Sequence, residues 1–192
     1  MAVQFNVTIP DNVTPQIYFK ELLPKILDNA KKEIPNMGEQ DFKMQINVGG
    51  KPFGLCLEKG KAPVVSEGDL AGAMIKLEVS EETWKATVTG KIDDQGGFTD
   101  FRRAGHPMAV QILKNLKGQL TTVLTRPDGP EVETRITFNG SENPKAKMKL
   151  SLQDYLDINS KKANGQMLFM QGRIMVEGDM GLIMQLQPLQ NL

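Results

Sequence analysis

The chain has 192 residues, with 23 basic and 23 acidic side chains and a formal net charge of zero. Hydrophobic residues make up 40% of it, which is typical of a globular protein and argues against intrinsic disorder. The balanced charge argues against nucleic-acid binding, because that affinity comes largely from neutralising phosphates. We therefore expect one large domain or two small ones, with no nucleic-acid partner.

Cysteine and histidine are almost absent from the chain. One cysteine, Cys56, and one histidine, His106, exclude an intramolecular disulfide and a zinc site built from these two residue types. No apolar run reaches the roughly 18 residues that a membrane span needs, and no secretory signal pattern opens the chain. We expect a soluble, cytoplasmic protein without a metal or a cofactor.

The first elements along the chain are a leader and a long helix. Residues 1–13 form the leader, and its alternating apolar residues are typical of an edge strand. Thr14 and Pro15 carry the signature of a helix start, and Pro35 ends the apolar helical pattern that follows. Pro24 lies inside this helix, where its missing N–H group predicts a kink.

A hairpin, a loop and a strand–helix unit come next. Gly49–Gly50 is the turn of the hairpin, residues 59–72 are expected to be a loop, and Ser80 caps a helix that ends at Gly90. Alternating hydrophobicity predicts the strands at 42–48, 53–57 and 74–79.

This order of elements recurs in the second half of the sequence. We expect a helix at 108–116, strands at 120–125, 132–138 and 148–152, and a helix capped at Ser151. Aligning Lys76–Leu77 with Lys149–Leu150 gives an offset of 73 residues, and Gly105 aligns with Gly178 at the same offset. The sequence therefore predicts two related units, at 14–104 and 105–192, after the leader.

The carboxyl-terminal segment is unusually rich in apolar residues. Residues 167–179 predict a mostly apolar strand bounded by glycines, after which Asp179 caps a helix. In residues 180–186 apolar side chains lie on nearly every side of that helix, so it must be buried or face an apolar ligand. Five of the 11 methionines of the chain fall in this region: Met167, Met170, Met175, Met180 and Met184.

These residues carry a resemblance to a known family. The run Phe169-Met170-Gln171-Gly172-Arg173-Ile174, followed by Gly178-Asp179-Met180-Gly181-Leu182, resembles the carboxyl-terminal signature of the sterol carrier protein type 2 superfamily. Residues 75–91 and 148–156 are similar to the strand-then-helix of that family, and the resemblance spans most of 14–189. The first unit has Phe98-Thr99-Asp100-Phe101-Arg102-Arg103 in place of the signature, so its pocket is expected to be degenerate.

The resemblance implies an α+β fold, with a mixed, largely antiparallel sheet covered on one face by helices and with an apolar tunnel between the layers. It implies non-enzymatic binding or transfer of a fatty acyl chain, a sterol or another long apolar molecule. Methionine suits such a site because its flexible thioether adapts to ligands of varied shape. The candidate ligand-binding residues are Phe169, Met170, Ile174, Met175, Met180, Leu182, Ile183, Met184 and Leu186.

Three alternative functions stay open at this point. The chain could be a dimerisation or interaction module without its own ligand, or an accessory protein that presents an apolar substrate to an enzyme. An enzyme acting on a lipid or an acyl thioester is the third alternative, but no set of nucleophile, base and orienting group is visible in its favour. Transient contact with a membrane surface and formation of a homodimer are also open.

Overall fold

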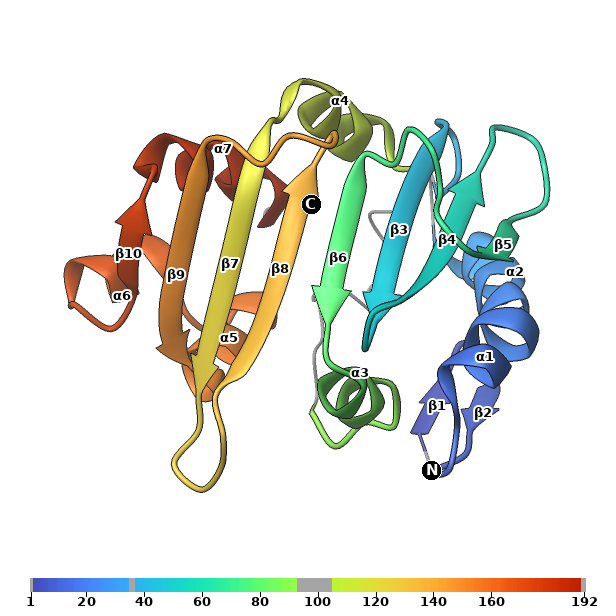
Figure 1. The fold of residues 1–192 in the computed structure, drawn as a ribbon, viewed down its shortest axis with the longest axis horizontal. Coiled ribbons are helices and arrows are strands. Elements are labelled where there is room, and N and C mark those ends of the chain that lie inside the picture. The colour runs from blue at the N-terminus through green and yellow to red at the C-terminus, as the bar shows by residue number, and fades with distance from the viewer. Residues whose placement is uncertain (1, 35–36, 93–104, 191–192) are drawn as a thin grey trace.

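The computed structural model describes residues 2–34, 37–92 and 105–190, and within these residues the central element is one eight-stranded sheet (Figure 1). Its strand order is β10-β9-β7-β8-β6-β3-β4-β5. Two neighbouring pairs, β3 with β6 and β7 with β9, are parallel, and the other pairs are antiparallel. The strands are β3 (Phe42–Val48), β4 (Lys51–Leu57), β5 (Val64–Glu67), β6 (Ile75–Val79), β7 (Gly118–Thr125), β8 (Val132–Phe138), β9 (Lys145–Ser151) and β10 (Met175–Gly178).

Helices cover one face of this sheet, as the expected α+β architecture requires (Figure 1). They are α1 (Pro15–Ile17), η1 (Tyr18–Leu22), α2 (Leu23–Glu33), α3 (Glu81–Val88), α4 (Pro107–Asn115), α5 (Leu152–Asn159), α6 (Gly165–Met170) and α7 (Met180–Gln190). None of the helices in the described ranges is long and apolar enough to cross a membrane.

The alternation of side chains along each strand explains why only one face is covered. On β3, Phe42, Met44 and Ile46 are buried against the helices, whereas Lys43 and Asn47 point to the opposite side. The same division continues across the sheet, so the uncovered face is polar. Figure 1 views the molecule from this open face, with α5 and α7 behind strands β7 to β9.

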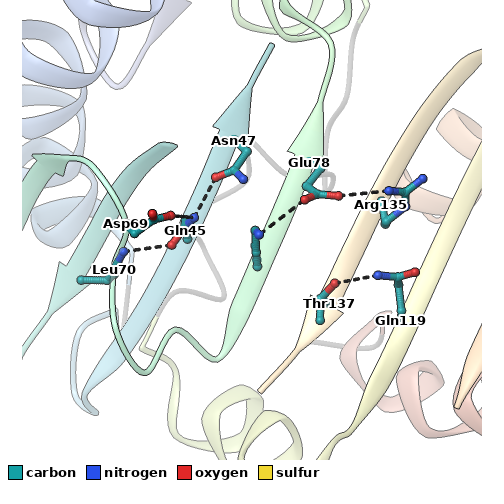
Figure 2. Close-up of polar contacts among 9 residues, drawn as sticks. Gln45, Asn47, Asp69, Leu70, Glu78, Gln119, Arg135 and Thr137 are labelled. Atoms are coloured by element: carbon teal, nitrogen blue, oxygen red, sulfur yellow. Dashed lines mark hydrogen bonds and ion pairs between the residues drawn. The ribbon is translucent and has the colours of Figure 1, made fainter. Parts of the chain in front are cut away.

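Polar contacts cross the open face near the centre of the sheet (Figure 2). The buried amide of Gln45 donates to Asn47 at 2.9 Å and to Asp69 at 3.0 Å, and its oxygen accepts from the Leu70 N–H at 2.9 Å. These bonds satisfy a buried amide and hold the loop between β5 and β6 against β3. Further along, Arg135 on β8 pairs with Glu78 on β6 at 3.3 Å.

The leader folds differently from the expected edge strand. Strands β1 (Ala2–Gln4) and β2 (Val7–Ile9) pair with each other in a separate two-stranded sheet. The chain reverses at Phe5 and Asn6, which have φ angles of 43° and 61°. The leader is therefore extended, as its alternating pattern predicts, but this tight turn makes it pair with itself and not at an edge of the main sheet.

The first long helix begins where the sequence predicts, and it is irregular just before Pro24. The Thr14 hydroxyl accepts a hydrogen bond from the Ile17 N–H at 3.3 Å, which confirms the cap. The irregularity is the π-helical segment η1, in which the Leu23 N–H bonds to the Tyr18 carbonyl. A π-turn accommodates a residue without an N–H group by changing the hydrogen-bond spacing locally.

Aromatic rings fill the space between these helices and β3–β4. Phe19 stacks on Phe53 with ring centroids 4.3 Å apart, and Tyr18 meets Trp84 edge-on at 5.6 Å. All four side chains are almost completely buried. The N-terminal half of the protein, residues 2–92, thus has a dense aromatic core.

Residues 98–103, which stand in place of the family signature in the first unit, lie outside the described residues.

The strand–helix unit recurs, but at a different spacing from the expected one. Ser80 caps α3 and Ser151 caps α5, 71 residues further on. The hydroxyls that end the two helices repeat at the same spacing, since Thr89 donates to the Lys85 carbonyl and Ser160 to the Leu156 carbonyl. In this segment the register is therefore shifted from the 73 residues of the sequence alignment, and an internal duplication stays a prediction.

Two short elements differ from the sequence-based expectations. The loop expected at 59–72 contains β5, which pairs with β4 at one edge of the sheet. The strand expected at 167–179 begins instead as α6, and only Met175–Gly178 is extended. Asn164 is the reason, because its side chain accepts from the N–H groups of Gln166 and Met167 and so starts a helix.

Candidate functional site

An apolar cavity of about 280 Å³ lies in the C-terminal half of the protein, residues 105–190. The inner face of β7, β9 and β10 forms one wall, and helices α5, α6 and α7 form the others. Its volume is near the lower end of the range of ligand sites, roughly 300–1,000 Å³. The lining residues are Leu120, Met148, Leu150, Tyr155, Ile158, Asn159, Gly165, Gln166, Phe169, Ile174, Val176, Met180, Ile183, Met184, Leu186 and Gln187.

The register of the strands builds the sheet wall. Met148 and Leu150 are two residues apart on β9 and therefore point to the same side. Met148 lies opposite Val176 of β10, which adds to the same wall. The residues between and beside them, Lys147 and Lys149, point to the open face. The alternation that directs the lysines of β9 to the open face therefore directs its apolar residues to the inner face.

Helix α7 forms the wall opposite the sheet. The Asp179 carboxylate accepts from the Leu182 N–H at 2.8 Å and so starts this helix directly after β10. Met180, Ile183 and Met184 are then three and four residues apart, on one side of the helix, and all three line the cavity.

An ion pair with a buried carboxylate fixes the segment between α6 and β10. The carboxylate of Asp154, in the first turn of α5, is buried and accepts a hydrogen bond from the guanidinium of Arg173. Arg173 is half exposed and immediately precedes Ile174, which lines the cavity. The pair thereby ties the turn before β10 to α5 and positions one side of the cavity wall.

The structure brings six of the nine candidate residues to the cavity: Phe169, Ile174, Met180, Ile183, Met184 and Leu186. The other three lie elsewhere. Leu182 is fully buried in the main core, Met170 is 74% exposed, and Met175 lies on the open face beside Lys149 of β9. A ligand-binding role for the six stays a prediction.

Sequence reasoning missed most of the sheet wall and the polar lining. Leu120, Met148 and Leu150 belong to strands that were expected from their alternating pattern, but their pairing into one wall depends on contacts far apart in the sequence. Tyr155 is not among the candidate ligand-binding residues, yet it is partly buried and lines the cavity. Its position one turn after the Ser151 cap, on the side of α5 that faces the sheet, is the signal that could have indicated a lining role.

No side chain in the described part of the lining is charged at neutral pH. This part contains no aspartate, glutamate, lysine, arginine, histidine or cysteine, and its polar side chains are three carboxamides and one phenol. No cluster of histidine, cysteine, aspartate and glutamate that could hold a metal ion occurs within the described residues. The arrangement is suited to enclosing an apolar group.

Comparison with known proteins links this half of the chain to one family. The model of the SCP-2 sterol transfer family matches residues 105–191, which include every residue that lines the cavity. No match was found among curated proteins.

Two solved structures are similar to the chain. The solution structure of the sterol carrier protein domain 2 of Helicoverpa armigera is 25% identical, with 54% of this chain and 85% of that chain covered and a TM-score of 0.37. The apo form of Sterol Carrier Protein 2 from Yarrowia lipolytica is 13% identical, with 96% and 94% covered and a TM-score of 0.19. The SCP-2 sterol transfer family is therefore the family that residues 105–191 match.

Proposed function

We propose that this protein binds and transfers lipids, and that the cavity holds the apolar part of one lipid molecule. The observation that carries the proposal is the apolar cavity of about 280 Å³ enclosed by β7, β9, β10 and α5–α7. The family match over the same residues supports lipid transfer in general. The absence of carboxylates, amines, imidazoles and thiols from the described lining favours binding over catalysis.

Burial of methylene groups is the main source of binding free energy, so the length of the apolar chain decides the affinity. Each methylene that leaves water contributes about 0.8 kcal/mol, so about ten of them contribute about 8 kcal/mol before the costs of association are subtracted. A micromolar dissociation constant corresponds to a net value of about 8 kcal/mol. Short acyl chains are therefore expected to bind weakly, and chains that fill the cavity are expected to bind well.

Large apolar side chains on the cavity wall also reach the surface. Phe169, Met180 and Met184 each line the cavity and are more than a third exposed to solvent. Thioether side chains change rotamer readily, so the two methionines can move aside for a ligand without unfolding of α7. Ligand binding would in turn cover part of this exposed apolar surface.

The decisive experiment has two parts. Lipid extraction of the purified protein followed by mass spectrometry should recover an apolar molecule in stoichiometric amount. A fluorescent acyl probe should bind to lipid-free protein, with an affinity that rises about fourfold per added methylene until the cavity is full. Repeated recovery of protein without lipid, together with no probe binding, would contradict the proposal. A protein that serves only for dimerisation would contain no lipid and bind no probe, and added lipid would not change its size-exclusion profile.

A further inference from the structure

The polar groups that line the cavity are all uncharged. Among its sixteen lining residues, the only polar side chains are those of Asn159, Gln166, Gln187 and Tyr155. They come from three different helices, α5, α6 and α7, so the pattern does not belong to one local stretch of sequence. A carboxamide both donates and accepts hydrogen bonds, which suits a hydroxyl, an ester or an amide.

The charged side chains of this half are directed elsewhere. Asp154 and Arg173 flank the cavity but bind each other. Lys161 and Lys162, in the turn between α5 and α6, are exposed and do not belong to the lining. The lysines of β9 point to the opposite face of the sheet, where Lys149 pairs with Glu131 at 2.6 Å. No cation in the described lining can therefore meet an anionic headgroup inside the cavity.

This distribution of charge discriminates between classes of lipid. A carboxylate or phosphate that enters the cavity loses its water and gains no opposite charge, which is strongly unfavourable. An uncharged polar group loses less on leaving water and can exchange hydrogen bonds with the carboxamides. The penalty falls on the headgroup alone, since the apolar chains of both classes make the same contacts.

We propose that the cavity selects lipids whose polar group is uncharged, such as long-chain alcohols and esters, over lipids of equal chain length that carry a carboxylate or a phosphate. The inference rests on the proposed function, because it concerns the same cavity. Gln166 and Gln187 are the specificity-determining residues, since each lines the cavity and is exposed enough to accept a charged replacement.

The test compares two ligands that differ only in the headgroup, cetyl alcohol and palmitate. Each displaces an uncharged fluorescent acyl probe from the lipid-free full chain. At neutral pH the alcohol should bind at least tenfold more tightly. As the pH falls through the pKa of the fatty acid, palmitate should gain affinity because it becomes neutral, whereas the affinity of the alcohol should not change.

A charge placed in the lining should reverse the preference. Gln187→Lys lies in the last turn of α7, where a cation suits the helix dipole, and it should tighten palmitate binding at least tenfold. Gln166→Lys provides a second variant, and Lys161→Gln with Lys162→Gln provides the matched control outside the lining. The wild-type pH series decides the question on its own if a lysine variant does not fold.

Two results would overturn the inference. One is palmitate binding at neutral pH that equals or exceeds that of the alcohol. The other is loss of palmitate binding in the Lys161→Gln, Lys162→Gln variant, since that would place the anion at the exposed lysines. If neither ligand displaces the probe, or if the probe itself does not bind, the proposed function fails rather than the headgroup preference.

Discussion

Met184 and Leu182 are two positions apart on α7 and have opposite surroundings. Leu182 is fully buried, and its side chain lies against Gly118, where an added Cβ would be only 3.0 Å from a leucine methyl group. Met184 lines the cavity and is 61% exposed. The first residue therefore supports the fold, whereas the second is available to a ligand.

Glutamate at position 184 should abolish lipid binding while leaving the fold intact. The carboxylate of Met184→Glu reaches water easily in the free protein, but it lies where an acyl chain would pack. We expect loss of probe binding with a change in unfolding free energy below about 0.5 kcal/mol, as for other surface substitutions. Fluorescence titration and urea unfolding measure the two quantities.

Two further variants make this result interpretable. Met170→Glu changes a more exposed methionine outside the cavity lining and should leave binding unchanged. Leu182→Ala removes a buried side chain and should lower the unfolding free energy by about 2–5 kcal/mol. Equal loss of binding in the 170 and 184 variants would mean that the cavity is not the binding site.

The buried phenol of Tyr18 predicts a loss of stability at alkaline pH. Burial raises the pKa of Tyr18 well above its ordinary value. The folded state therefore keeps this proton where the unfolded state releases it, so the stabilisation is complete below about pH 10 and is lost as the pH rises further. Tyr18→Phe should flatten this alkaline decline, which urea midpoints at neutral and alkaline pH would measure.

The same substitution has a cost at neutral pH. The Tyr18 hydroxyl donates to the Gln4 side-chain oxygen at 3.2 Å, and its loss should lower stability by about 1 kcal/mol. Hydrogen bonding to Glu58 raises the pKa of Lys61, but this lysine is exposed and adds little to the alkaline decline. An unchanged alkaline decline in Tyr18→Phe would show that other groups cause it.

At the scale of elements, the ion pair between α5 and the α6–β10 turn is asymmetric. The Asp154 carboxylate is buried and the Arg173 guanidinium is half exposed. Removal of the cation leaves a buried charge without compensation, whereas removal of the anion leaves a cation that water can reach. The two single substitutions are therefore expected to differ in their effects.

Arg173→Gln should lower the unfolding free energy by about 3 kcal/mol, and Asp154→Asn by about 1 kcal/mol. The double variant should be more stable than Arg173→Gln alone, because it removes the unpaired charge. Both single variants should weaken lipid binding, since Ile174 follows Arg173 directly in the cavity wall. Urea unfolding of the wild type, the two single variants and the double variant measures these free energies. Equal losses of unfolding free energy in the two single variants would contradict the expected asymmetry.

Elements with strong local signals could be predicted from the sequence. The caps at Thr14, Ser80 and Ser151 each use a side chain and a backbone N–H group only three residues apart, and all three are present. Strand β8 has the expected bounds because its polar and apolar residues alternate. These features depend on short stretches of chain and little else.

Elements that depend on distant contacts were harder to predict. Helix α6 has an apolar sequence compatible with a strand, and the Asn164 cap decides between the two. Strand β5 exists through its pairing with β4. The cavity shows the same difference. Some of its helical residues could be predicted from the local sequence, but Leu120 and Leu150 line it only because β7 and β9 pair in parallel, and this pairing joins residues far apart in the sequence.

At the scale of the whole molecule, the two halves share one sheet. Strand β6 of the N-terminal half pairs with β8 of the C-terminal half along the full length of β6, from Ile75 opposite Phe138 to Val79 opposite Thr134. The Arg135–Glu78 ion pair crosses the same seam. A continuous ladder of this kind favours unfolding of both halves in one transition.

The single tryptophan makes this coupling measurable. Trp84 lies in the aromatic core of the N-terminal half, far along the sheet from the cavity. Its fluorescence should change in the same urea transition as the circular dichroism of the whole chain. A lipid at 100 times its dissociation constant should raise the unfolding free energy reported by Trp84 by about 2.7 kcal/mol. Separate transitions, or a Trp84 transition that lipid does not shift, would show that the halves are independent.

The order of strands has a consequence for how the sheet ends. Strand β10 pairs antiparallel with β9 and is the last strand at this edge of the sheet. It has only four residues, whereas β9 beside it has seven. Displacement of β10 would uncover the edge of β9 and offer it to the outer strand of a second chain. An edge strand of four residues offers fewer unpaired N–H and C=O groups than the seven residues of β9 would, so β10 makes this end of the sheet a poorer template for another chain.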